Sequence, residues 1–150
     1  MNEKETDKIN FRRIAFTDVD AVLALNRKLI QPDSQITYTD LASVALTSPL
    51  DMSFVCEVNH TIIGFVLARI VHAGIPVQEV CNVHALLVEP DYRRHGIGRR
   101  LVNEVVDHCK QEGIRRIRTL VDEGNNEVKQ FFESHGFRRS NFVNYDRASS

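Results

Sequence analysis

Arginine and glycine residues gather in one short run, Arg93-Arg94-His95-Gly96-Ile97-Gly98, between an apolar segment and an amphipathic one. This pattern predicts a strand that ends just before the run and a helix that begins at its end. The first turn of a helix has unpaired N–H groups and the positive end of the helix dipole, which together bind anions. Glycines let successive N–H groups approach one ligand, and arginines add charge-assisted hydrogen bonds. These residues therefore favour the binding of a pyrophosphate.

Charge and spacing limit which ligand this turn can bind. The run lacks the third glycine of a dinucleotide-binding fingerprint, and no Gly-Lys-Ser/Thr sequence marks a P-loop. The formal net charge is −1, so the chain lacks the overall positive field of nucleic-acid-binding proteins. Positive charge is instead concentrated at Arg93, Arg94, Arg99, Arg100, Arg115, Arg116 and Arg118. A small polyanion fits this distribution, and a surface turn with arginines for solubility is the plain alternative.

The hydrophobic pattern predicts the elements that position the turn. Strands are predicted over residues 9–14, 52–58, 61–72, 77–88, 114–121 and 137–145. Helices are predicted from Thr17 to about residue 30, and over 38–46, 98–112 and 125–135. Asn59-His60 suits a two-residue hairpin turn, which makes the strands on either side of it antiparallel. The strand, helix, strand order that follows requires a parallel crossover, so we expect a mixed sheet.

Length and composition indicate one domain. The chain has 150 residues, of which 43% are hydrophobic, enough for a single core. Residues 1–8 lack apolar periodicity, and we expect a flexible tail there, followed by a single domain over 9–150. No apolar run approaches the roughly 20 residues that cross a bilayer, so we expect a cytoplasmic protein without a membrane partner. Cys56, Cys81 and Cys109 lack metal-ligand spacing, so we expect reduced core cysteines and no metal.

Two longer blocks link the sequence to a known family. The block Leu-Leu-Val-Glu-Pro-Asp-Tyr-Arg-Arg-His-Gly-Ile-Gly-Arg-Arg-Leu, which starts at Leu86, resembles motif A of the GNAT superfamily of N-acetyltransferases, whose core is Arg/Gln-x-x-Gly-x-Gly/Ala. The block from Asn125 to Phe137 is similar to motif B, with Val128 where the family has alanine. The two blocks stand in the family's order, about 30 residues apart. The predicted order of elements fits the family's fold over nearly the whole chain.

The resemblance implies a fold and a cofactor. The fold is α/β (α+β), with a central mixed sheet of six to seven strands flanked by about four helices and splayed at the cofactor cleft. Acetyl-CoA, the cosubstrate, would lie between the strands predicted over 77–88 and 114–121, where it would pair with strand backbone as an extra strand does. The cofactor-binding residues so implied are Leu86, Leu87, Val88, Arg93, Arg94, His95, Gly96, Ile97, Gly98, Arg99 and Asn125. Leu86 and Val88 also read as ordinary core residues, and Asn125 as an ordinary helix N-cap.

The activity implied by the resemblance is transfer of an acetyl group to a primary amine by direct attack in a ternary complex. The amine must lose a proton, the oxyanion needs a donor, and the thiolate must leave. The backbone N–H of Val88 would be the oxyanion donor. The family's frequent tyrosine acid falls on Phe132, which has no proton to give. Either another group such as Tyr145 supplies it, or the thiolate leaves unaided, since a thiol pKa near 8.5 makes it a tolerable leaving group.

Several residues are candidates for the general base. The glutamate of relatives that acetylate protein N-termini falls on Leu120, which argues against that substrate. Glu79, Asn82 and His84 lie on the strand that leads into motif A, and Asp122 is a further candidate. His84 is our first choice for the catalytic base, because it shares strand parity with Leu86 and Val88 and imidazole titrates near neutral pH.

The acceptor is an amine on a small molecule or a protein. Its pocket is expected to form from the segment over 31–39, the hairpin and the last strand, with Asp33, Asp40 or Asp51 attracting a cationic amine. Rival hypotheses are a module that senses acyl-CoA without turnover, and an interaction domain whose turn binds nothing. The resemblance also allows a homodimer.

Overall fold

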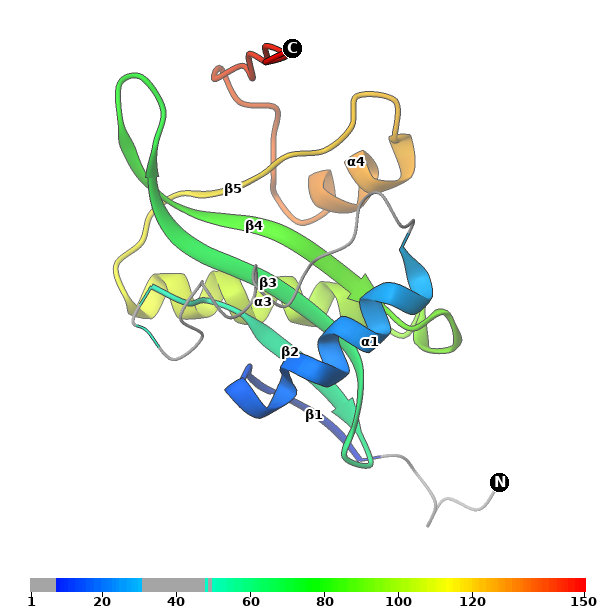
Figure 1. Ribbon diagram of the computed structural model, residues 1–150. Helices are drawn as coiled ribbons and strands as arrows, with labels where there is room; N and C mark the ends of the chain where they lie inside the picture. The colour runs from blue at the N-terminus through cyan, green and yellow to red at the C-terminus, as the bar shows by residue number, and fades with distance from the viewer. Residues whose placement is uncertain (1–7, 31–47, 49) are drawn as a thin grey trace.

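The structure is a computed structural model that describes residues 8–30, 48 and 50–150. Its centre is one five-stranded sheet in the order β1-β2-β3-β4-β5 (Figure 1). The strands are β1 (Ile9–Arg13), β2 (Phe54–Val58), β3 (Thr61–Ala73), β4 (Gln78–Val88) and β5 (Ile117–Thr119). The first four strands pair antiparallel, whereas β5 pairs with β4 in parallel. The sheet is therefore mixed, as the sequence predicts.

Helices cover both faces of this sheet. They are α1 (Val19–Leu29), α3 (Ile97–Gln111) and α4 (Asn126–Glu133), with short 3-10 helices η2 (Phe16–Asp18) and η4 (Pro90–Tyr92). In Figure 1, α1 crosses in front of the sheet and α3 runs behind it, while α4 lies beyond the β4 and β5 side. None of the helices in the described residues is long and apolar enough to cross a membrane.

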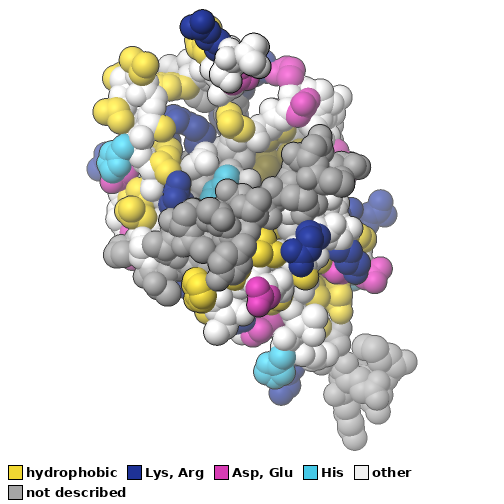
Figure 2. Space-filling view, in the orientation of Figure 1, with side chains coloured by type: hydrophobic (Ala, Val, Ile, Leu, Met, Phe, Trp, Pro, Cys, Tyr) yellow, Lys and Arg dark blue, Asp and Glu magenta, His cyan; other side chains and the backbone are white. Residues whose placement is uncertain are grey.

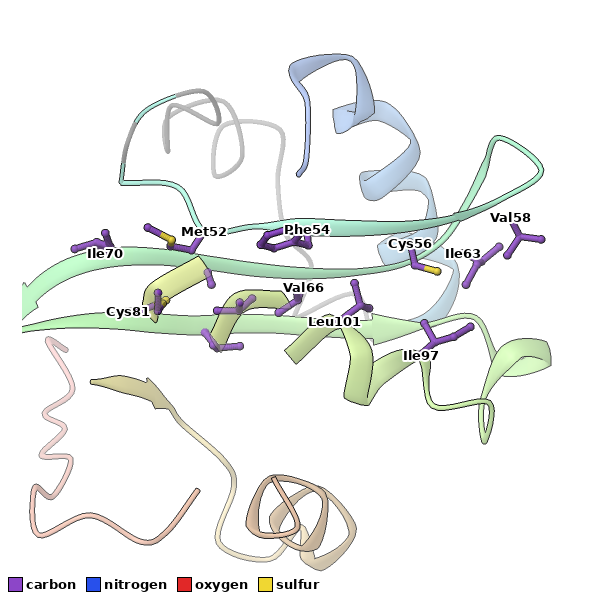
Figure 3. Close-up of a cluster of buried hydrophobic side chains, with 14 residues drawn as sticks. Met52, Phe54, Cys56, Val58, Ile63, Val66, Ile70, Cys81, Ile97 and Leu101 are labelled. Carbon is purple, nitrogen blue, oxygen red and sulfur yellow. The ribbon is translucent and has the colours of Figure 1, made fainter. Parts of the chain in front are cut away.

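Two apolar clusters hold these layers together. One cluster joins α3 to β2, β3 and β4 through side chains such as Leu101, Val66 and Cys81 (Figure 3). The other joins α1 to the opposite sheet face through Val22, Phe65 and others. Burial of a large apolar side chain contributes about 1.5–3 kcal/mol, so these clusters fix the end of β4 and the start of α3 relative to one another.

Most predicted elements are confirmed, with shifted ends. Asn59 and His60 both have positive φ, at 50° and 69°, so the predicted two-residue hairpin turn is confirmed. Asp18 precedes α1 but does not cap it through its side chain, because its carboxylate accepts hydrogen bonds from Arg12 and the Ala15 N–H instead. The helix predicted over 38–46, the acceptor segment over 31–39, and residues 1–7 of the predicted tail lie outside the described residues.

The strand predicted over 137–145 is wrong, and the one predicted over 114–121 is too long. Residues 137–145 contain no strand, and β5 has only three residues. The Ser140 hydroxyl accepts the Phe142 N–H at 2.9 Å, so a local turn takes a donor that a sheet ladder would use. Five strands in the described residues therefore replace the expected six to seven.

Candidate functional site

The turn between β4 and α3 presents unpaired backbone donors. Gly96 precedes α3 with φ 75°, and its carbonyl accepts the first helical hydrogen bond from Arg100 N at 2.9 Å. Within the described residues, no acceptor is found for the N–H groups of residues 94–99. Arg94 also has positive φ, at 66°, which is uncommon for a residue with a Cβ. These N–H groups and the positive end of α3 form an anion site.

The side chains of the turn divide into anchors and exposed groups. Ile97 is buried in the α3 core cluster and so fixes the first turn of the helix. The His95 ring folds back onto the Tyr92 carbonyl, with Nδ1 at 3.1 Å from the oxygen. Arg94 and Arg99 are exposed, so both guanidinium groups are available to an anion.

Gly98 differs from Gly96 in its role. Its φ is not positive, unlike that of Gly96. A Cβ at Gly98 would lie 3.5 Å from the Phe131 ring, so the glycine instead lets α4 approach the start of α3.

The last residues of β4 have an open edge. β5 pairs with β4 only at Cys81, Asn82 and Val83. The Leu87 carbonyl faces β3, because a Cβ on Gly64 would lie 3.1 Å from its oxygen. Because the C=O and N–H of a trans peptide point in opposite directions, the Val88 N–H faces away from β3, toward the open edge. No described strand pairs with this edge over 84–88, so an extended ligand has backbone groups to bind there.

Arg93 closes one end of this edge. Its Nε donates to the Val88 carbonyl at 3.2 Å. The sequence alone did not indicate this contact, because a side chain that binds backbone five residues earlier leaves no periodic signal. Arg93 therefore couples the turn to the open edge of β4.

His84 occupies an irregular position that the parity argument did not anticipate. Leu67 pairs with Ala85 and the next residue, Ala68, pairs with Val83, so His84 is the extra residue of a β-bulge. Val83, Leu86 and Val88 all pack in the α3 cluster, although strict alternation would separate the first from the other two. The claim that His84 shares simple parity with Leu86 and Val88 is wrong. His84 is exposed beside the point where β4 and β5 separate.

Comparison with known proteins decides the family. The sequence pattern of the acetyltransferase (GNAT) family matches residues 20–137. The chain belongs to the GNAT acetyltransferase family. It is 34% identical over 94 residues to an uncharacterised N-acetyltransferase of Methanocaldococcus jannaschii, covering 62% of this chain and 42% of that protein. It is 32% identical over 90 residues to the mycothiol acetyltransferase of Thermobispora bispora, covering 57% of this chain and 30% of that protein. The chain thus spans less than half the length of both relatives.

A solved structure agrees with the fold. The aminoglycoside N-acetyltransferase AAC(6')-Iy in complex with CoA superposes with a TM-score of 0.82 at 18% identity, covering 97% of this chain and 98% of that one. This likeness confirms the mixed α/β GNAT fold. β5 pairs with β4 in parallel, and this pairing ends at Val83, so the two strands separate beyond that residue. This separation is the splay that the family resemblance implies.

Motif B of this GNAT chain forms α4 as predicted. Asn125 caps the helix, because its Oδ1 accepts the Val128 N–H at 3.1 Å. Phe132 is 7% exposed and its ring meets those of Phe131 and Phe137 edge-on, with centroids 5.1 Å away in both pairs. Phe132 is thus a buried aromatic residue at the position where the family resemblance implied a tyrosine acid.

The structure gives less support to the other residues considered as acids, bases or amine-binding groups. Tyr145 is 90% exposed, and Leu120 is 74% exposed. Asp122 accepts the Gly124 N–H at 2.7 Å within its loop. Asp51 is 1% exposed, and burial raises the pKa of its carboxyl, so it is not the accessible acid expected to attract an amine. Asp33 and Asp40 lie outside the described residues, and Glu79 is exposed near His72, its Oε2 lying 3.7 Å from the imidazole Nε2.

The three cysteines lie in the core as expected. Cys56, Cys81 and Cys109 are free and buried. Burial raises the pKa of Cys56 to about 11, so its thiol is protonated at neutral pH. Among the described residues no group of His, Cys, Asp or Glu side chains is arranged to hold a metal ion.

Proposed function

We propose that the protein transfers an acetyl group from acetyl-CoA to a primary amine. The observation that supports this most strongly is the pair of neighbouring donor sets, the open backbone edge of β4 and the unpaired N–H groups of residues 94–99. An arm that carries a pyrophosphate fits such a set, because the edge accepts an extended chain and the helix start accepts the anion. The CoA complex of AAC(6')-Iy, a protein of the same fold, is consistent with this choice.

The residues of this chain have distinct parts in the proposed binding. Leu86, Leu87 and Val88 contribute backbone to the extended arm. The turn from Arg93 to Arg99 contributes N–H groups and the Arg94 and Arg99 guanidinium groups to the phosphates. Asn125, at the start of α4, faces the same cleft from the other wall in this proposal.

The proposed reaction is direct. The amine nitrogen attacks the thioester carbonyl carbon, the C–S bond breaks, and the electron pair leaves with the thiolate. The Val88 N–H, which faces the open edge, stabilises the oxyanion. His84, at the bulge beside the separation of β4 and β5, takes the amine proton directly or through water. Phe132 cannot return a proton to the thiolate, so the thiolate leaves unaided.

CoA binding is tested first, by thermal unfolding. CoA at 100 times its dissociation constant should raise the free energy of unfolding by about 2.7 kcal/mol. Release of free thiol from acetyl-CoA is then followed with a mixed panel of amines, with wild type beside His84→Ala. A variant that binds CoA normally and loses turnover supports the base assignment.

A second candidate function is acyl-CoA sensing without turnover. It is favoured by Phe132, which occupies the position of the usual acid. It predicts normal CoA stabilisation and no thiol release with any amine. An interaction domain whose turn binds nothing predicts no stabilisation.

A further inference from the structure

A cavity of about 870 Å³ lies beside β5, away from the glycine turn. Its walls are β5 with the residues that follow it, α4, and the C-terminal segment over 137–144. None of residues 93–99 lines it. Figure 2 shows Lys and Arg side chains within a hollow of the surface beneath the C-terminal segment. The cavity therefore offers charge that is separate from the proposed phosphate site.

The cavity has an excess of positive charge. Its charged lining residues are the cations Arg116, Arg118, Lys129, Arg138 and Arg139 and the anions Glu123 and Glu133. Glu123 is shared between two cations, because it pairs with both Lys129 and Arg139. Among the described residues, the other three cations, Arg116, Arg118 and Arg138, thus form no ion pair with a carboxylate.

Two guanidinium groups are held in place by an uncharged side chain. Arg116 and Arg118 both donate to Oε1 of Gln78, at 2.6 and 3.1 Å. Gln78 is an uncharged amide, so it orients the two groups and leaves their charge available. Arg118 also lies over the Phe142 ring, 5.2 Å from its centroid. Oriented guanidinium groups bind carboxylate or phosphate with little loss of side-chain freedom.

Apart from Thr119, Ser140 and Asn144, the uncharged part of the lining is apolar. Leu120, Phe132 and Val143 contribute to it, and Leu120 and Val143 are among the exposed large hydrophobic side chains. A ligand that fits has an anionic end and an apolar body.

The cavity adjoins the place where acetyl transfer is proposed. Thr119, one of its lining residues, donates from Oγ1 to the Val83 carbonyl at 3.0 Å, at the last pair between β4 and β5. Phe132, which also lines it, occupies the position of the family's usual acid. A molecule in the cavity thus extends toward the cleft between β4 and β5.

We infer that this cavity binds the anionic end of the acceptor, so the acceptor is an amine that carries a carboxylate or phosphate on an apolar body. This inference rests on the proposed acetyl transfer. The inferred acceptor differs from the acetylneamine part of the CoA bisubstrate analogue with which AAC(6')-Iy has been solved. A polycationic amine is repelled by this lining.

The test compares matched amines. Acetylation of 4-(aminomethyl)benzoate is measured against 4-(aminomethyl)benzamide, which has the same body and amine without the negative charge, and against neamine. Wild type should prefer the benzoate in kcat/KM by about tenfold or more, the effect of one hydrogen bond to a charged group. Arg118→Gln with Arg138→Gln should raise KM for the benzoate and leave the benzamide unchanged.

Controls separate this inference from the proposed function. Arg115→Gln removes a nearby exposed charge that does not line the cavity, and should leave the benzoate preference unchanged. Equal use of benzoate and benzamide, or a preference for neamine, overturns the inference while confirming acetyl transfer. If neither benzoate nor benzamide is acetylated, titration of the benzoate into the CoA complex decides. The inference is overturned if the benzoate does not bind, or if it binds the double variant as well as it binds wild type. It is also overturned if the double substitution weakens the binding of CoA instead of the benzoate.

Discussion

Replacement of Gly96 by alanine should separate ligand binding from folding. Gly96 has φ 75°, and a Cβ there would meet no atom within 4 Å, so alanine introduces backbone strain without a clash. Strain of this kind costs about 1 kcal/mol, and a chain of this size should lose about 2–4 °C in Tm. The strained backbone relaxes by changing φ, which redirects the N–H groups that follow. Loss of one hydrogen bond to a charged phosphate should weaken CoA binding by about tenfold or more.

Gly113 provides a matched control at the other end of the same helix. Its φ is 74°, and a Cβ there also meets nothing within 4 Å. Gly113→Ala should therefore cost the same stability and leave CoA binding unchanged. At a CoA concentration 100 times the wild-type dissociation constant, stabilisation should fall from about 2.7 to about 1.4 kcal/mol only in Gly96→Ala. Equal CoA affinities of the two variants, measured by calorimetric titration, would refute the anion site at the turn.

Phe132→Tyr supplies the missing acid and should raise kcat by up to about 10²-fold with little change in the KM of acetyl-CoA; an unchanged kcat would show that position 132 does not reach the leaving thiolate. Asn125→Ala should lower the free energy of unfolding by about 1 kcal/mol through loss of the cap on α4, whereas Asn126→Ala, one residue inside the helix, should change it by less in the same denaturant titration. Burial alone would raise the pKa of Asp18, but the hydrogen bonds from Arg12 and the Ala15 N–H outweigh it and hold the pKa below its usual value. The folded state therefore favours the charged form, so this contribution is complete above about pH 4 and is lost as the pH falls through the lowered pKa. Urea titrations from neutral pH downward should show a smaller acid loss in Asp18→Asn, and an identical acid loss would count against the Arg12 clamp.

The sequence predicted best those elements whose pattern is local. The apolar stripe of α3 marks a helix whatever surrounds it, because side chains three and four residues apart share one face. The Asn59-His60 turn was also predictable, since few residue pairs adopt positive φ twice. Asn125 as a cap needed only its own helix.

The errors arise where structure depends on a distant partner. A strand forms only beside another strand, and the segment over 137–145 is separated from β5 by the cavity. The bulge at His84 depends on how β3 pairs with β4, and the residues around it read as an uninterrupted strand. Likewise, the cations of the cavity come from three separate stretches of chain, so only the fold brings them together.

Mass spectrometric detection of an acetylated amine tests the central claim most directly. The protein is incubated with acetyl-CoA and a mixed amine panel, and thiol release is measured in the same samples. We predict an N-acetyl product formed in equal amount with free CoA. Both should fall in parallel when Gly96→Ala is assayed at acetyl-CoA concentrations below its raised dissociation constant. Bound acetyl-CoA that yields no acetylated amine with any acceptor would contradict the account and leave the protein a binding module.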